Sequence, residues 1–220
     1  MGSSETGSKR LSLSEALRER TSALHAEAER SGVINDILRK TADTRSYAML
    51  LRNLLPAYSE MERALERHRE SPTLGVFARP ELHRASRIAA DLVAMCGEDW
   101  RADLPLLPAG ERYAARVATA GEGDGSRLLA HAYVRYFGDL SGGQVLKRLL
   151  GTSLGLGAES LSLYDFPGVS DPKALKDQMR DAIDREGDAN GEVIILEGIR
   201  AFEHNIEVSR AVQALANAPA

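Results

Sequence analysis

The chain has 220 residues, of which 43% are hydrophobic and 27% are charged, the balance of an ordinary globular protein with one large core. A formal net charge of -4 gives no basic excess for binding nucleic acid, and no apolar run approaches the roughly 20 residues that span a bilayer. The single cysteine, Cys96, excludes an intramolecular disulfide and a zinc site built from cysteines, so we expect a soluble, cytoplasmic protein.

The residue pattern is helical from Ser12 onward. A capping box formed by Ser12 and Glu15 predicts that a first helix begins there and ends near Arg30. Pro56 lies inside a long helical pattern and should kink that helix without ending it. In chain order, the later helices are expected at about 34–40, 44–70, 80–96, 109–120, 126–150, 171–186 and 190–214.

Nothing along the chain divides it into two cores. We find no strand alternation, no repeat of fixed period and no long linker. The sequence therefore predicts one all-α domain over residues 11–215, with a flexible leader at 1–10 and a flexible tail at 216–220.

The string LSGGQ at 140–144 matches the signature loop of ATP-binding cassette proteins. Such proteins also need a Walker A loop and a sheet whose strands alternate with helices. This chain has no Gly-Lys dipeptide and no strand pattern, so we reject nucleotide hydrolysis. The string instead belongs to a helical pattern with several glycines, each of which costs a helix about 1 kcal/mol relative to alanine.

One face of this glycine-containing helix is unusual. On a helical wheel, Arg135, Gly138, Asp139 and Gly142 fall within an arc of about 100°. Two interpretations are open: the glycines let another helix pack closely, or a flat ligand lies against bare backbone beside a buried carboxylate.

The first helix carries a second candidate face. Arg18, His25 and Glu29 lie within roughly 40° on the helical wheel, and His25 and Glu29 are four residues apart. Glu29 can therefore reach one imidazole nitrogen and leave the other free for a metal. The alternative is a surface histidine in a charged pair.

The segments LSEALR at 13–18, LHAEAE at 24–29 and AHAYVRYFGDLSGGQVL at 130–146 closely resemble the haem oxygenase family. Shorter matches follow in the same order along nearly the whole chain; they are ESP at 70–72, ELHR at 81–84, RY at 112–113, DFP at 165–167, AF at 201–202 and NI at 205–206. The resemblance implies a helical fold that holds haem b between a proximal helix and a kinked distal helix.

The resemblance also implies a reaction. Haem would be both substrate and oxygen-activating cofactor, cleaved with dioxygen and external electrons to biliverdin, carbon monoxide and ferrous iron, with attack expected at the α-meso carbon. His25 would be the proximal ligand of the haem iron, with Glu29 as its orienting carboxylate. Asp139 would deliver protons through an ordered water. The rest of this proton network is implied to be Arg135, Tyr58, Tyr113 and Asn205.

The remaining haem contacts follow from the same resemblance. The backbone at Gly138, Gly142 and Gly143 would approach the macrocycle. Arg18, Lys176 and Arg180 would bind the propionates, with Tyr133 as a hydroxyl donor and Phe202 packed on the haem. These assignments place the cofactor between the helix that carries His25 and the helix with the glycines.

The other histidines are weaker ligand candidates. His68 lies in a charged run and is interpreted as solvated, and His83 and His204 lack a neighbouring carboxylate in a matching context. His131 precedes Gly138 by almost two turns and should make a structural hydrogen bond.

The expected partner is an electron donor, either a ferredoxin or a soluble flavoprotein reductase, and a bilin reductase would act downstream. We expect a monomer that binds neither nucleic acid nor membrane; a place in a plastid stroma would require the removal of a transit peptide. Two alternatives remain open: a haem carrier or sensor without catalytic activity, and a di-metal oxidase on the same scaffold.

Overall fold

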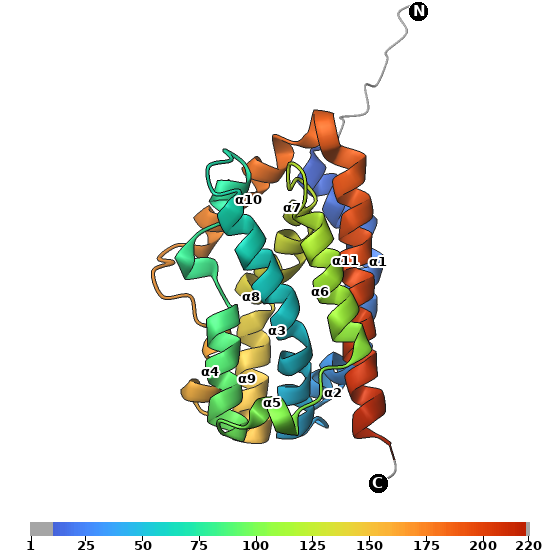
Figure 1. Ribbon diagram of the computed structural model, residues 1–220, viewed down its shortest axis with the longest axis vertical. Helices are drawn as coiled ribbons and strands as arrows, with labels where there is room; N and C mark the ends of the chain where they lie inside the picture. The colour runs from blue at the N-terminus through green and yellow to red at the C-terminus, as the bar shows by residue number, and fades with distance from the viewer. Residues whose placement is uncertain (1–10, 219–220) are drawn as a thin grey trace, which may run out of the picture.

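The computed structural model describes residues 11–218, and this part of the chain is helical and contains no strand (Figure 1). The predicted leader at 1–10 lies outside the described residues. The helices are α1 (Leu13–Glu29), α2 (Gly32–Arg39), α3 (Thr44–Arg67), α4 (Ala85–Cys96), α5 (Trp100–Asp103), α6 (Pro108–Ala120), α7 (Leu128–Ala132), α8 (Gly138–Ser141), α9 (Gly143–Leu154), α10 (Pro172–Asp184) and α11 (Gly187–Ala216). Single 3-10 turns occur at η1 (Leu74–Val76), η2 (Pro80–Leu82), η4 (Ala158–Ser160) and η5 (Ser162–Tyr164).

The predicted capping box starts α1. The Glu15 amide donates to Ser12 Oγ over 3.4 Å, and the Ser12 amide donates to the Glu15 carboxylate over 3.0 Å. The capping-box prediction is therefore confirmed. Leu13, Leu17 and Ala28 bury their side chains on one face of this helix, and the polar residues lie beside that face.

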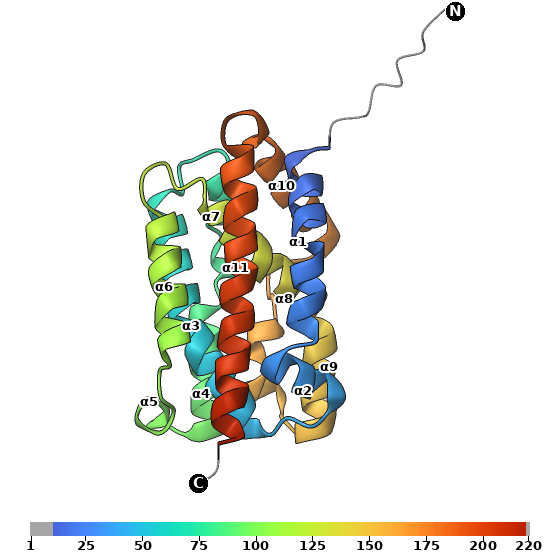
Figure 2. The same cartoon turned by 90° about the vertical axis from the view of Figure 1, so that its right-hand side faces the viewer.

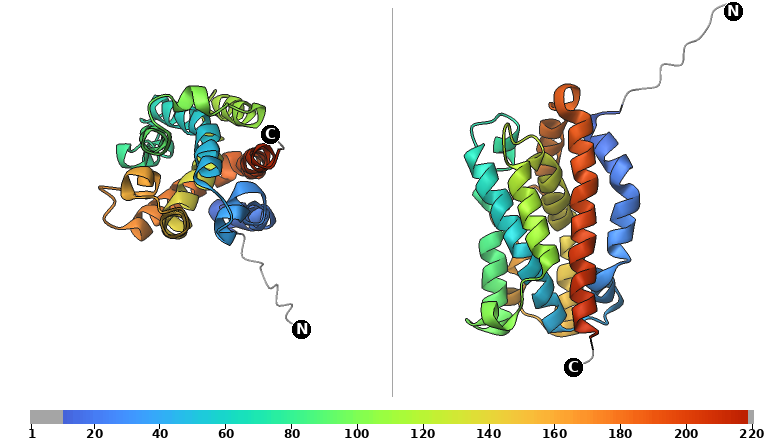
Figure 3. Two further views of the ribbon diagram at one scale, coloured as in Figure 1. Left: turned by 90° about the horizontal axis from the view of Figure 1, so that it is seen from below. Right: turned by 45° about the vertical axis from the view of Figure 1, so that its right-hand side comes forward.

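α11 runs the length of the molecule beside α1 and α6, and α1 and α11 point in the same direction (Figure 2). On the other side, α3 packs between α4 and α6, and α2 packs against both α11 and α9. The end view in Figure 3 shows these helices grouped around a common axis. This arrangement places α1 opposite the chain segment that runs from α7 to α9.

α3 continues through Pro56, as predicted, but ends at Arg67 rather than near residue 70. His68 is the C-cap residue, and its Nε2 lies 3.1 Å from the carbonyl oxygen of Gly121. The interpretation of His68 as a solvated residue was therefore wrong. α5 was not predicted; it is a single turn that buries Trp100.

A buried arginine explains why α4 begins later than predicted. The region from 80 was expected to be one helix, but the chain makes the 3-10 turn η2 before α4 begins at Ala85. The Arg84 side chain is fully buried and donates to the carbonyls of Leu82 and Leu163, each over 3.1 Å. Glu62 accepts from the Arg84 and Ala85 amides, which are the first donors of α4. These tertiary contacts override the local helical pattern.

The glycine-containing helix is not uniform. The expected helix at 126–150 is divided into α7, a π-helical segment η3 (Tyr133–Phe137), α8 and α9. Gly142 separates α8 from α9 although its backbone keeps helical angles, with φ of -73° and ψ of -23°. π-Helical segments and such interruptions are common at functional sites.

Two further observations complete the fold. α11 extends to Ala216, so the first residue of the predicted tail is helical. Among residues 11–218, no helix combines the length and the apolar composition that a bilayer crossing demands.

The contact between α1 and α11 yields a matched stability test. An added Cβ at Gly198 would lie 2.5 Å from Leu17 Cδ1, and Leu17 is fully buried. At Gly191, on the same helix, the nearest atom is Leu13 Cδ1 at an ordinary 3.6 Å. We expect Gly198→Ala to lower the free energy of unfolding by about 1–3 kcal/mol through overpacking. Gly191→Ala should raise it by roughly 0.5–1 kcal/mol, because alanine favours the helix. Urea unfolding of both variants measures the difference, and equal effects would contradict the packing.

Candidate functional site

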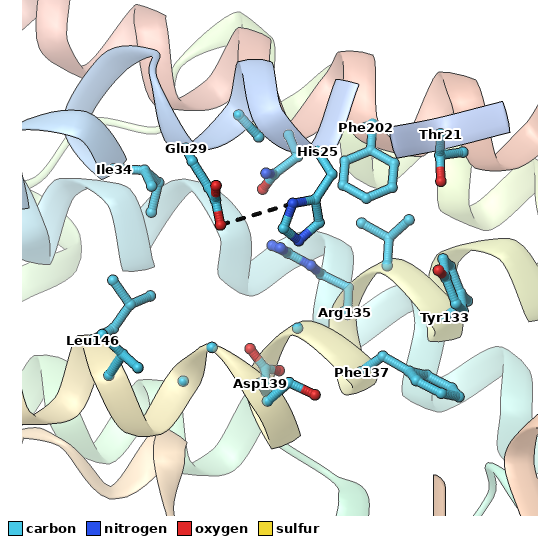
Figure 4. A pocket seen from close by; sticks show the side chains of 18 of the residues that line it. Thr21, His25, Glu29, Ile34, Tyr133, Arg135, Phe137, Asp139, Leu146 and Phe202 are labelled. Carbon is cyan, nitrogen blue, oxygen red and sulfur yellow. Dashed lines mark ion pairs between the residues drawn. The ribbon is translucent and has the colours of Figure 1, made fainter. Parts of the chain in front are cut away.

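A cavity of about 660 Å³ lies between α1 and the segment from η3 to α9 (Figure 4). α2 contributes Ile34 and Leu38 to its wall, and α11 contributes Phe202 and Asn205. Its volume is within the roughly 300–1,000 Å³ typical of ligand pockets. The wall is mostly apolar, with its polar groups concentrated on α1 and around Asp139.

α1 turns its predicted polar face into this cavity. Arg18, His25 and Glu29 all line it, and Figure 4 shows the His25 ring in the open space between the two walls. His25 Nδ1 lies 3.8 Å from Glu29 Oε1, which leaves Nε2 without a carboxylate neighbour. The ring also meets the edge of Phe202, with 5.8 Å between centroids. His25 is therefore a half-exposed imidazole whose rotation is restricted by two neighbours.

The opposite wall has open space where side chains would normally lie. A Cβ added at Gly138 would meet no atom within 4 Å, and one added at Gly142 would meet only the Gly138 carbonyl oxygen at 3.6 Å. Packing within the protein therefore requires neither glycine. Of the two earlier interpretations, close helix–helix packing does not apply to these two residues.

Gly143 differs from the other two glycines. Although it borders the cavity, it is buried, and a Cβ there would lie 2.8 Å from the Tyr164 ring. The neighbouring Gln144 donates to the Tyr164 carbonyl over 2.7 Å, which holds α9 against η5. Packing on Tyr164 thus gives Gly143 a structural reason that Gly138 and Gly142 lack, and its contact with haem stays a prediction.

Asp139 is the buried charge of the site. Its side chain is only 8% exposed, and the Tyr58 hydroxyl donates to Oδ2 over 2.7 Å. The Arg135 guanidinium lies 5.5 Å from the centre of the Tyr58 ring. Burial raises the pKa of Asp139 by more than the Arg135 charge and the Tyr58 hydrogen bond lower it. Burial and the negative charge of Asp139 also raise the pKa of Tyr58, so that hydroxyl stays a donor.

The other predicted network residues occupy two different places. Asn205 and Arg135 line the cavity, whereas Tyr113 is fully buried behind it on α6. The Tyr113 hydroxyl has no hydrogen-bond partner among residues 11–218, and burial raises its pKa. Tyr58 is likewise behind the wall and acts through Asp139.

The residues predicted to bind the propionates, which we call the rim residues, fall into two groups: some line the cavity and others lie just outside it. Arg18 lines the cavity and is exposed, and Tyr133 lines it with its ring 5.0 Å from Phe137. Lys176 and Arg180 do not line it, but each contacts a residue that does: Lys176 donates to Ser141 Oγ over 3.1 Å, and the Arg180 guanidinium lies 5.5 Å from the Phe137 ring centre. Both cations therefore stand just outside one edge of the cavity.

Sequence reasoning missed most of the apolar wall. These residues have ordinary side chains whose pattern does not distinguish a cavity wall from a core; they are Ala28, Ile34, Leu38, Val134, Phe137, Val145 and Leu146. The exposure of Leu38 and Val145 in the folded chain, 37% and 46%, is a signal that only the structure supplies. Thr21, Ser22 and Ser141 also line the cavity, and the helical wheel of α1 predicts the side on which the first two lie.

Three of the histidines outside the cavity lie next to carboxylates. His131 is fully buried, with Nε2 2.9 Å from Glu197 Oε1, which confirms its structural hydrogen bond. His83 lies 3.5 Å from Glu66, and His204 lies 3.6 Å from Glu207, so each has a carboxylate neighbour that the sequence did not indicate, but neither lines the cavity. Within the part of the chain that the structure describes, no group of three or more histidine, cysteine, aspartate or glutamate side chains is placed to hold a metal ion.

Comparison with known proteins gives a consistent result. The family model described as "Heme oxygenase" matches residues 11–211. Heme oxygenase 1 of Nostoc sp. is 33% identical over 204 residues, which cover 91% of this chain and 86% of that protein. Heme oxygenase 1 of Homo sapiens is 33% identical over 208 residues, which cover 92% of this chain and 72% of that protein.

Solved structures agree with these relatives. Heme oxygenase-1 of Synechocystis sp., solved in complex with heme, has a TM-score of 0.86 and 32% identity, covering 93% of this chain and 94% of that one. The heme oxygenase of Leptospira interrogans has a TM-score of 0.84 and 32% identity, covering 91% of this chain and 100% of that one.

The buried carboxyl of Asp139 predicts a pH-dependent stability. Because its pKa is raised in the folded protein, folding favours the protonated form, and the free energy of unfolding falls as pH rises from the unfolded pKa through the folded one. Asp139→Asn removes this charge and leaves an oxygen for Tyr58. We expect the variant to be more stable than the wild type near pH 8, with an advantage that shrinks towards pH 5, as measured by urea unfolding. A variant that is less stable near pH 8 would show that the pairing with Arg135 outweighs burial.

Proposed function

The chain belongs to the haem oxygenase family, and from this premise we propose how its own residues carry out the reaction. It is an enzyme that cleaves haem, with dioxygen and external electrons, to biliverdin, carbon monoxide and ferrous iron. Bound haem supplies the iron that activates dioxygen and is itself the molecule that is oxidised. Membership of this family removes the haem carrier and the di-metal oxidase as alternatives.

The shape of the cavity supports haem as its ligand. Gly138 and Gly142 present bare backbone opposite His25, and no protein atom occupies the space that their side chains would fill. A flat, largely apolar molecule fits between two such walls, since its faces would meet backbone on one side and an imidazole on the other. This open space is the observation that carries the assignment.

We assign His25 as the proximal ligand of the haem iron. Its Nδ1 faces Glu29 over 3.8 Å, so Nε2 is the nitrogen left for the metal. A carboxylate this close to Nδ1 would favour the tautomer with its proton on that nitrogen, which makes the imidazole a better donor to iron through Nε2. Phe202 restricts the ring from the side and would also contact the macrocycle.

Asp139 is proposed to deliver the protons. Burial raises its pKa above the usual range of an aspartate, which favours the protonated carboxyl that a proton donor needs. Tyr58 holds it by a hydrogen bond, Arg135 lies over the Tyr58 ring, and Asn205 lines the same cavity. Asp139 stands on the glycine wall, so the proton is released on the face of the cavity opposite His25.

The rim cations are proposed to fix how the haem is rotated in its plane. Arg18 lies on one wall, and Lys176 and Arg180 lie beyond Ser141 and Phe137 on the other. Carboxylates at this edge would be attracted by all three, with Tyr133 as a hydroxyl donor. Holding the propionates here would present one meso edge to the site near Gly138, and we propose that the α-meso carbon is the one attacked.

Electrons must come from a separate reductase, as is normal for this family. We propose that the donor is a ferredoxin or a flavoprotein reductase that approaches the edge with Arg18 and Lys176. Arg18 is exposed and lines the cavity, and the half-buried Lys176 contacts Ser141 at its edge, so positive charge there would steer an acidic protein to the haem edge. A bilin reductase would then receive the product.

Asp139→Ala tests the proton assignment. The variant should bind haem with the wild-type absorption spectrum, because the carboxyl lies on the wall opposite His25. Its rate of biliverdin formation with reductant and air should fall at least about 100-fold, the usual share of a general acid. Product absorbance and carbon monoxide release measure the rate, with the exposed Asp188→Ala as a control that should behave as wild type. An undiminished rate in Asp139→Ala would remove this role.

A further inference from the structure

Tyr113 lies between two imidazole rings. The His204 ring is stacked on it with 5.6 Å between centroids and 9° between planes, and the His131 ring lies 5.9 Å away at 41°. All three side chains are buried or nearly so; His204 is the most exposed, at 22%. The tyrosine ring is therefore clamped by one histidine from α11 and one from α7.

The two histidines are themselves fixed in different ways. His131 is held by Glu197, which also pairs with Arg116, and these contacts lower the pKa of Glu197 to about 2 despite its burial. Among the described residues, His204 is held by the stacking and by Glu207, which lies 3.6 Å away and is shared with Arg112. His204 is thus the less constrained side of the clamp.

The Tyr113 hydroxyl depends on this clamp for its position. It has no hydrogen-bond partner among residues 11–218, so no polar contact within that part of the protein sets its direction. Burial raises the pKa of Tyr113, and Arg135 and Asp139 are near enough to shift that pKa further, in opposite directions. The Tyr113 phenol is therefore close to two residues that line the cavity.

We propose that His204 is a positioning residue for the reaction: by stacking on Tyr113 it holds the phenol hydroxyl towards Arg135 and Asp139. This inference rests on the proposed function, because it assigns Tyr113 to the proton network of that site. His204 itself does not line the cavity, and its neighbour Asn205 does, so α11 serves both the wall and the support behind it. The flat ring of His204, rather than its charge, supplies the contact.

The test compares His204→Ala with His204→Phe in the full-length protein. His204→Ala should slow biliverdin formation about tenfold, as expected when a group in the network is displaced, while haem affinity stays within about twofold of wild type. His204→Phe keeps a flat ring and should restore the rate to within about twofold. A role in folding alone would change thermal stability and haem affinity without this separation from turnover.

A double-mutant cycle with Tyr113→Phe completes the test. If His204 acts through the Tyr113 hydroxyl, adding His204→Ala to Tyr113→Phe should slow turnover by less than about twofold further. Wild-type turnover in His204→Ala, or full additivity in the double variant, would overturn the proposal while leaving the proposed function intact. Failure of the wild type to form biliverdin would instead overturn the proposed function, and this inference with it.

Discussion

The site depends on one constraint: the wall opposite His25 must lack side chains. Gly138 and Gly142 each leave space that no other part of the protein fills, at a cost of about 1 kcal/mol per glycine in a helix. The π-helical segment η3 and the interruption at Gly142 occur along the same stretch of chain. The helix is thus less stable along the cavity than a regular α-helix would be, as is common where a site requires residues that disfavour the helix.

The second destabilising feature of the site is a buried carboxyl. Asp139 lies on the glycine wall, bonded to Tyr58 behind it, in surroundings that disfavour its charged form. The surrounding structure compensates with well-packed contacts that have no part in the reaction. Gly143 packs on Tyr164, Gly198 packs on Leu17, and Arg84 is satisfied by backbone carbonyls. Internal packing therefore accounts for Gly143 and Gly198 but not for Gly138 and Gly142.

The sequence predicted local features better than tertiary ones. The capping box of α1 and the shared face of Arg18 and His25 depend on helical periodicity alone, and both are found in the structure. The start of α4 depends on Arg84 and its distant partners, and the packing role of Gly143 depends on Tyr164, 21 positions further along the chain. The stack on Tyr113 and the apolar cavity wall likewise depend on residues that are distant in the chain. No pattern within one helix carries that information.

The most direct measurement compares Gly142→Ala with Gly143→Ala for thermal unfolding and for biliverdin formation. Gly142→Ala should unfold at the wild-type temperature or slightly above, because the added Cβ meets only one atom, at 3.6 Å. Its turnover should fall at least about tenfold, because the methyl group enters the space assigned to haem. Gly143→Ala should instead lower the unfolding temperature, since its Cβ would lie 2.8 Å from the Tyr164 ring. Wild-type turnover in Gly142→Ala would contradict the account.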